Sequence, residues 1–485
     1  MSIKFYNTLS RRMEEFVPLQ EGKVKFYVCG PTVYDYIHLG NARAFIVFDV
    51  LRRFLRFVGY DVTYVMNLTD VDDKIIRRSQ QEGVPIADIT KKFTDAFFED
   101  LGNLGILGAD FHPPATENMP EIVDLIRRLM ENGAAYEVEG DVYFEVSQFK
   151  EYGLLSGKKT DELRSGARVT VDKRKKNPLD FALWKSQKPG EPAWESPWGP
   201  GRPGWHVECS AMSMKFLGET FDIHAGGTDL IFPHHENEIA QSVCATGGGF
   251  VRYWLHNGFL NIAGEKMSKS LGNFKTVRDV LKHHSQYVIR MFFLQKHYRT
   301  PIDLTPEGLH AATSAVSRLK IFHDKLIEKV ASISLDSEEE QKTSPKRDLP
   351  EPFAQLKAEI IAAMSDDLNT PTALAKLFDI VREGNKYLAK PVLSNAEQNL
   401  LFMLKDTVDE LNSFLGLLGA DDPEQDSRLV DDLVGLLIEV RSELRLKKEW
   451  ELADKIRHRL DESGVALEDS GTGTHWRKKD FSKKP

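Results

Sequence analysis

The chain has 485 residues, of which 41% are hydrophobic and 28% are charged. This length suggests about three domains, and the composition excludes a disordered, collagen-like or disulfide-stapled protein. No run of about 18 apolar residues occurs, and no basic-then-apolar segment opens the chain. We therefore expect no membrane span and no secretion signal.

Charge and cysteine content narrow the setting further. With 64 basic and 73 acidic side chains the formal net charge is −9, so a nucleic-acid partner needs a local basic surface. The three cysteines, Cys29, Cys209 and Cys244, cannot all pair and form no disulfide framework. We expect a cytoplasmic protein in a reducing compartment.

The first third of the chain predicts an α/β layer. Residues 23–29 form a strand pattern, a helix follows from about 41 to 58, and a second strand spans 61–67. A strand–helix–strand unit with short links is typical of a parallel sheet. A ligand is then expected beyond the carboxyl ends of these strands, where Cys29-Gly30-Pro31 and Asn67-Leu68-Thr69 follow.

The rest of the chain divides into an insertion, a second α/β half and a helical part. Residues 136–146 alternate about a turn and predict a hairpin, whereas 177–204, rich in Pro, Gly and Trp, suggest an irregular loop or insertion. A strand at 221–224 and a helix starting near His234 resume the α/β pattern. Beyond about Thr305 we expect no strands but helices at 319–330, 353–364, 371–388, 397–417 and 429–460, then a basic tail.

The motif HLGN, residues 38–41, is suited to phosphate binding. It lies between a strand and the helix that follows, where unpaired backbone N–H groups and the helix dipole attract an anion. His38 and Asn41 can each donate a hydrogen bond to phosphate or ribose. Taken alone, the motif is equally typical of a helix-capping turn with a solvated histidine.

The motif KMSKS, residues 266–270, follows a turn at Gly264. Its lysines, Lys266 and Lys269, suit the charge that develops on a triphosphate attacked at its α-phosphorus. An isolated lysine pair is usually an ordinary basic surface loop. The presence of both motifs, in this order and in an α/β context, favours a nucleotide site.

Four further residues form a candidate metal site: Cys29, Cys209, His234 and Glu238. His234 and Glu238 are four apart on a predicted helix and so face the same way. Two thiolates, an imidazole and a carboxylate can satisfy a tetrahedral zinc ion. Spacing alone does not reveal such a site, because Cys209 also fits a small buried hydrophobe and His234 and Glu238 a polar helix face.

HLGN and KMSKS resemble the two signatures of the class I aminoacyl-tRNA synthetases. Within that class the chain resembles the cysteinyl-tRNA synthetases, in the segments FYVCGPTVYDYIHLGNARAF, NLTDVDDKI, GWHVECSAMS, FDIHAGGTDLIFPHHENEIAQS and GEKMSKSLGN. The commoner first signature ends in His where this chain has Asn41, which keeps a hydrogen-bond donor. The resemblance runs to Trp476.

This resemblance implies a doubly wound, Rossmann-like parallel-sheet catalytic domain with an insertion, followed by an all-α C-terminal helical bundle. The implied boundaries are 1–115 for the first catalytic half and 116–203 for the connective insertion. Residues 204–304 then form the second half with the zinc and KMSKS segments, 305–420 the bundle, and 421–485 an anticodon-binding region with a basic tail.

The implied activity is that of a cysteine–tRNA ligase, and we expect the chain to be a monomer. Cysteine and ATP, accompanied by Mg²⁺, would give cysteinyl-adenylate and pyrophosphate, and cysteine would then pass to the 3′-terminal ribose of its tRNA. One zinc ion, held by Cys29, Cys209, His234 and Glu238, would bind the substrate thiolate and reject serine.

The resemblance also implies roles for individual side chains. It assigns His38 and Asn41 to ATP, Lys266 and Lys269 to the departing pyrophosphate, and Thr69, Trp205 and Asp229 to the bound cysteine. Asp229 would pair with the ammonium group, and Trp205 would wall the pocket or remain a core aromatic. Cys244 matches no ligand and is expected to serve packing.

Two alternative functions and one alternative surface stay open from the sequence. A cysteine:amino-sugar ligase shares the chemistry but ends after a short helical piece, and a non-catalytic tRNA-binding paralogue would have damaged motifs. Basic residues of 441–460 and Trp476 suit RNA contacts, although a charged helix face is usually only solvated.

Overall fold

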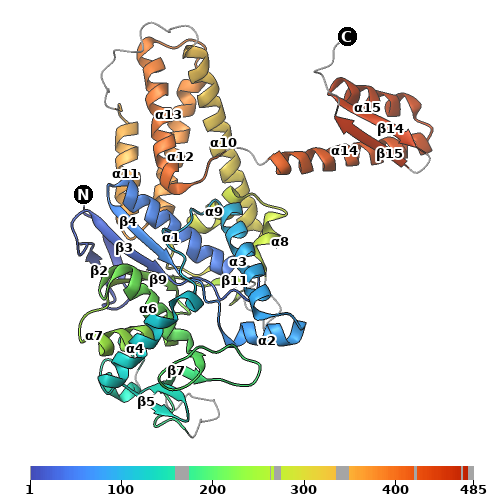
Figure 1. Cartoon of the computed structure of the whole chain (residues 1–485). Helices are drawn as coiled ribbons and strands as arrows, with labels where there is room; N and C mark the ends of the chain where they lie inside the picture. The colour runs from blue at the N-terminus through green and yellow to red at the C-terminus, as the bar shows by residue number, and fades with distance from the viewer. Residues whose placement is uncertain are drawn as a thin grey trace. The chain divides into compact units, whose positions relative to one another are not determined.

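The computed structural model describes residues 2–158, 174–262, 264–266, 275–334, 349–419, 423–470 and 473–478. The chain divides into two compact units, Met1–Leu418 and Gly419–Pro485 (Figure 1). Among the described residues, no helix combines the length and the apolar content needed to cross a bilayer.

A four-stranded parallel sheet forms the centre of the first unit. Its order is β10 (Val251–Asn257), β9 (Phe221–Gly227), β3 (Lys23–Val28) and β4 (Asp61–Met66). The chain leaves β3 for β4 on one side and later returns to β9 on the other. The strand order therefore reverses between β3 and β9, which is where open α/β sheets bind ligands.

Helix α1 (Leu39–Phe57) makes the crossover from β3 to β4. Its predicted apolar face is buried, with Phe45, Phe48, Leu51 and Leu55 each at most 2% exposed. The helix contacts β4 as well as α9 (Gln286–Leu294) and α13 (Asn395–Leu415), so it lies inside the unit rather than on its surface. The predicted doubly wound α/β domain is confirmed, and its first elements agree with the sequence to within two residues.

The insertion forms a second, antiparallel sheet. Helix α4 (Met119–Glu131) precedes β5 (Ala135–Val138), β6 (Asp141–Phe144), β7 (Phe181–Ser186) and β8 (Gly201–Pro203), which pair in that order. The predicted hairpin is confirmed as β5–β6. The expectation of an irregular 177–204 is wrong in part, because Leu183 and Trp184 are fully buried and hold β7 in the sheet.

Further helices and strands complete the catalytic part. They are β1 (Lys4–Asn7), β2 (Arg12–Glu15), α2 (Asp73–Glu82), α3 (Ile86–Asn103), α6 (Trp205–Leu217), α7 (Glu236–Thr246), β11 (Leu260–Ile262), β12 (Glu265–Lys266), α8 (Val277–Leu281) and β13 (Ile302–Asp303). A π-helical turn, Ile231–His235, leads into α7, so His234 lies in this turn and not on the regular helix that the sequence predicts to start near it.

A helical bundle stands at the other end of this unit from the insertion (Figure 1). It consists of α10 (Pro306–Ser334), α11 (Phe353–Ser365), α12 (Thr370–Leu388) and α13. Buried Arg290, on α9, joins the bundle to α1. Its guanidinium donates to Leu415 O at the end of α13 at 2.6 Å and to the Asp49 carboxylate on α1 at 2.6 Å. The bundle is thus fixed to the helix that carries HLGN.

The second unit corrects three expectations. It contains α14 (Pro423–Leu446) and α15 (Trp450–Glu462) where one helix over 429–460 was expected. The helix breaks because Lys448 adopts a left-handed φ of 63°. Strands follow after all: β14 (Val465–Ser470) and β15 (Gly473–Lys478) form an antiparallel hairpin, so Arg477 and Lys478 belong to a strand, not to a tail.

Burial also revises two RNA-contact candidates in this unit. Trp476 packs against the small core around Val434, Leu460 and Leu467, so its ring serves that core. Arg441 is only 2% exposed and is not placed to meet a phosphate in solution. Lys447, Lys448 and Lys455 are exposed and remain suitable for that purpose.

Candidate active site and metal centre

A cavity of about 290 Å³ opens where the strand order reverses, beyond the carboxyl ends of β3 and β9. The sequence-predicted residues that line it are Cys29, His38, Asn41, Thr69, Trp205, Cys209, Asp229 and His234. They come from five separate segments of the chain, and only the sheet topology brings them together. Glu238 lies on α7 beside Cys29 and His234.

The two remaining predicted residues belong to the KMSKS motif. Lys266 ends the short strand β12, and Lys269 lies outside the described residues. On the far side of the motif, Leu39 N–H donates to Lys275 O at 3.2 Å and Val277 N–H donates to Ile37 O at 3.1 Å. The segment that follows KMSKS is therefore hydrogen-bonded to the residues around HLGN.

The cavity lining at the carboxyl end of β3 requires a glycine at position 30. A Cβ at Gly30 would lie 1.7 Å from Asn67 O, an impossible contact. Instead, Gly30 N–H donates to Asn67 Oδ1 at 2.8 Å, and Thr69 N–H donates to Pro31 O at 3.1 Å. These bonds tie the ends of β3 and β4 together and hold buried Thr69 in the cavity wall.

His38 and Asn41 cap the helix that they begin. Asn41 N–H donates to His38 Nδ1 at 3.1 Å, and His38 N–H donates to Asn41 Oδ1 at 3.3 Å, a reciprocal capping box. Because Nδ1 accepts the hydrogen bond from Asn41 N–H, the ring of a neutral His38 carries its proton on Nε2. The cap thus uses His38 Nδ1 and Asn41 Oδ1, and both residues line the cavity.

Trp205 and Asp229 stand at the mouth of the cavity. Trp205 is 38% exposed and opens α6, so it is not a core aromatic. Its ring stacks on the His234 imidazole with centroids 4.6 Å apart and an interplanar angle of 27°. Exposed Asp229 follows β9 in the loop that leads to His234 and places a carboxylate at the cavity wall.

Cys29, Cys209, His234 and Glu238 form a fully buried cluster with one ligand atom each, all within 4.8 Å of one another. Cys29 Sγ lies 3.9 Å from Cys209 Sγ and 3.8 Å from Glu238 Oε1, and His234 Nε2 lies 3.0 Å from Glu238 Oε1. Tetrahedral zinc with Zn–S near 2.3 Å sets two sulfur ligands about 3.8 Å apart. The donor types and their spacing therefore fit this ion.

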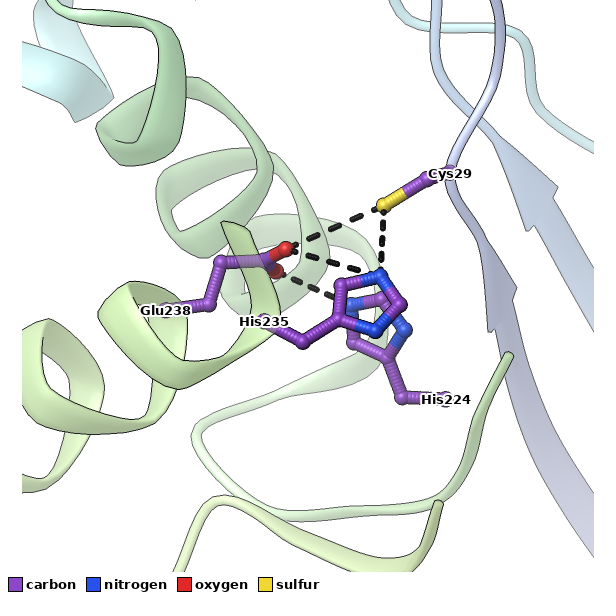
Figure 2. A group of neighbouring side chains, drawn as sticks. All are labelled: Cys29, His224, His235 and Glu238. Atoms are coloured by element: carbon purple, nitrogen blue, oxygen red, sulfur yellow. Dashed lines mark hydrogen bonds and ion pairs between the residues drawn. The ribbon is translucent and has the colours of Figure 1, made fainter. Parts of the chain in front are cut away.

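A second group with suitable donor atoms overlaps the first: Cys29, His224, His235 and Glu238. Figure 2 shows its side chains converging: Cys29 directly follows β3, His224 lies on β9, His235 ends the π-helical turn and Glu238 lies on α7. Here His224 Nε2 lies 2.9 Å from Glu238 Oε2, and His235 Nε2 lies 3.3 Å from Cys29 Sγ. Of the second group only Cys29 lines the cavity, whereas Cys29, Cys209 and His234 of the first group do, so the first group is the more open to the cavity.

Electrostatics make the first group a ready cation site. A hydrogen bond from Cys29 lowers the pKa of Cys209 to about 6 against the opposing effect of burial. Burial raises the pKa of Glu238, but His224 and His234 together lower it to about 2. Burial alone would lower the pKa of His234, yet Glu238 and Cys209 raise it to about 10. Without a metal, the proton on His234 offsets one of the two buried negative charges, on Cys209 and Glu238, and a divalent ion in its place can neutralise both.

The sequence analysis missed a set of histidines behind the cluster. His206 Nδ1 lies 2.9 Å from His234 Nδ1, and His235 Nδ1 lies 2.8 Å from His256 Nε2. Burial lowers the pKa of His206 and of His235 well below the usual value, and that of His256 to about 3, so these rings are neutral. They orient the donors in front of them. Their only sequence signal was their place in WHVE, PHHE and LHN, within or next to segments already assigned.

Cys244 stands apart from the cluster. It is partly buried against the apolar core of the insertion, and burial raises the pKa of its thiol to about 11. This agrees with the packing role expected for it.

Comparisons with known proteins agree along the whole chain. Residues 15–314 match the family described as the tRNA synthetases class I (C) catalytic domain, and 359–419 match the DALR domain. The chain is 49% identical to the "Cysteine--tRNA ligase" of Heliobacterium modesticaldum over 99% of its length and 100% of the relative. It is also 49% identical to that of Thermococcus onnurineus, with 99% of each chain covered.

Among solved structures, the chain shares its fold with methionyl-tRNA synthetase of Mycobacterium tuberculosis in complex with methionyl-adenylate. The TM-score is 0.62 at 16% identity, over 81% of this chain and 92% of the other. The sheet reversal, the two signature segments and the sequence matches lead to one assignment. The chain belongs to the cysteine–tRNA ligases of the class I aminoacyl-tRNA synthetases.

Proposed function

We propose that this chain activates L-cysteine with ATP and transfers it to the 3′-terminal ribose of its cognate tRNA. The observation that carries the proposal is the single cavity shared by HLGN and the Cys/His/Glu cluster. A nucleotide at α1 and an amino acid at the cluster would meet in that space. Neither step requires a protein nucleophile, so catalysis consists of positioning and charge stabilisation.

In the activation step the cysteine carboxylate attacks the α-phosphate of ATP, and pyrophosphate leaves. His38, Asn41 and the N-terminus of α1 are assigned to the phosphates, which is supported by their position on the cavity wall. Lys266 and Lys269 are assigned to the departing pyrophosphate, with Mg²⁺ held mainly by phosphates and water. The cap at His38 also fixes which ring nitrogen carries the proton.

Cysteine selection is assigned to Cys29, Cys209, His234 and Glu238, which would hold one zinc ion. When bound, zinc supplies strong affinity for a soft thiolate and little for a hydroxyl, which separates cysteine from serine. Trp205 walls the side of this pocket, Asp229 pairs with the substrate ammonium, and buried Thr69 limits the floor. His206 holds His234 in place through Nδ1.

The second unit is assigned to binding the anticodon region of the tRNA. Exposed Lys447, Lys448 and Lys455 would contact its phosphates. Support for a tRNA substrate over an amino sugar comes from the length of the match. Relatives named cysteine–tRNA ligase align with 99% of this chain, its helical part included. We place the enzyme in the cytoplasm. We also propose that it is a monomer, which sedimentation can test.

The test is aminoacylation of total tRNA with labelled cysteine, with labelled serine in parallel. The expected result is charging with cysteine alone. Cysteine-dependent ATP–pyrophosphate exchange without tRNA charging would favour the amino-sugar ligase, and absence of both reactions in zinc-replete protein would favour a binding-only paralogue.

A further inference from the structure

The cavity wall on its nucleotide side comes from two distant segments. One is the first turn of α1, with His38, Gly40 and Asn41. The other is the link between β10 and β11, where Gly258 and Phe259 line the cavity. For a nucleotide to fit, the spacing between these two segments must be held fixed.

The second segment is hydrogen-bonded to the backbone of residues 297–302, and the two together are called the block here. Gly258 N–H donates to Tyr298 O at 2.8 Å, and Ile302 N–H donates to Phe259 O at 3.0 Å. A Cβ at Gly258 would lie 2.6 Å from Arg299 O, so the two backbones pack without a side chain between them. The same block continues through β11 into β12, which ends at Lys266.

Arg43 joins this block to α1. It lies on α1 two residues after Asn41, and its Nη1 donates to Gly258 O at 2.7 Å and to Phe259 O at 2.8 Å. Its Nη2 donates to Tyr298 O at 3.1 Å and to Thr300 O at 2.5 Å, with a longer bond of 3.5 Å to His297 O. One guanidinium thus holds five main-chain carbonyls from both parts of the block.

Main-chain carbonyls, and no acidic side chain among the described residues, compensate the charge of Arg43. Arg43 is completely buried, and within the described part of the chain no carboxylate pairs with it. Burial lowers its pKa to about 10. An unpaired buried charge is costly, so the carbonyls alone compensate it. Only the planar fork of arginine can reach all of them, since an ammonium group has three donors around one point.

We propose that Arg43 is a positioning residue that sets the width of the ATP slot by fixing residues 258–260 relative to the first turn of α1. The inference rests on the proposed function, because it assigns this part of the cavity to ATP. Arg43 does not line the cavity and acts through Gly258 and Phe259. It therefore affects ATP binding and leaves the cysteine half of the site, formed by β3, α6 and α7, unchanged.

The test is cysteine-dependent ATP–pyrophosphate exchange by the full-length, zinc-loaded Arg43→Lys variant. The expected result is an ATP KM raised about tenfold, equivalent to about 1.4 kcal/mol, with the cysteine KM within threefold of wild type. Partial unfolding lowers the amount of active enzyme and hence kcat, but it does not change KM. Arg43→Gln, which loses the charge and keeps one NH₂ group, serves as a second variant with a larger expected rise.

The matched control is Arg52→Lys. Arg52 is also completely buried on α1 and also donates to main-chain carbonyls, Leu107 O at 2.9 Å and Gly108 O at 2.8 Å, but neither of these lines the cavity. Its ATP KM should stay at the wild-type value.

Three results overturn the inference: an unchanged ATP KM in both Arg43 variants, an equal rise of ATP and cysteine KM, or the same ATP effect in Arg52→Lys. Absence of exchange in the wild type would instead refute the proposed function.

Discussion

Replacing Cys209 by serine tests the metal centre most directly. Cys209 is 2% exposed, and its pKa of about 6 makes it largely a thiolate at neutral pH. A serine hydroxyl in the same place stays protonated and is a poor zinc ligand. Four-ligand zinc sites bind with about 12 kcal/mol, so one donor carries roughly 3 kcal/mol. The zinc affinity of Cys209→Ser should therefore fall by at least about 100-fold.

The assay is zinc content after equilibration in buffered free zinc, measured together with the cysteine KM in pyrophosphate exchange. Both should change in the same variant, because the ion is proposed to bind the substrate thiolate. Cys244→Ser is the control, since this third cysteine packs in the insertion core away from the cluster. It should keep wild-type zinc content and cysteine KM.

Wild-type zinc affinity in Cys209→Ser would remove Cys209 from the ligand set. The alternative group, Cys29, His224, His235 and Glu238, would then hold the ion, because it does not include Cys209. If the variant lost zinc but kept the wild-type cysteine KM, the assignment of Cys209 as a zinc ligand would stand. The role of the zinc ion in cysteine selection would be refuted.

Three further predictions concern other residues. Lys269→Ala should lower adenylate formation by orders of magnitude at unchanged zinc content; retained pyrophosphate exchange would remove its role. Asn41→Asp keeps the Oδ1 acceptor of the cap but loses the amide donor, so the ATP KM should rise about tenfold with little change in Tm, whereas an unchanged KM would limit Asn41 to capping. Burial raises the pKa of Asp100 to about 6 despite its ion pair with Arg278. Because this folded-state pKa exceeds the unfolded value of about 3.8, the stability contributed by Asp100 falls as pH rises from about 4 to about 6. Asp100→Asn should thus gain stability over the wild type across that window in denaturant unfolding; a pH-independent difference would contradict this.

The local elements of the catalytic domain could be predicted because their patterns are local. Apolar runs and helical periodicity predict a strand at 23–29, a helix at 41–58 and a strand at 61–67. The bounds of these elements in the structure agree to within two residues. The second unit could not be predicted in the same way. A left-handed Lys448 and a hairpin held by a core of a few side chains leave little pattern in the sequence.

The sequence by itself determined the family, through whole motifs, and the residue types from which a zinc and nucleotide site can be built. Only the tertiary structure decided which of them meet. Cys29 and Cys209 are 180 residues apart, and their sulfur atoms come within 3.9 Å because α6, which carries Cys209, packs against β3, which ends just before Cys29. The buried histidines behind the cluster, and Arg43 beneath the cavity wall, have no sequence signal of their own. Their roles depend on which backbone carbonyls and ring nitrogens the fold brings within hydrogen-bond distance, and periodicity carries no information about that.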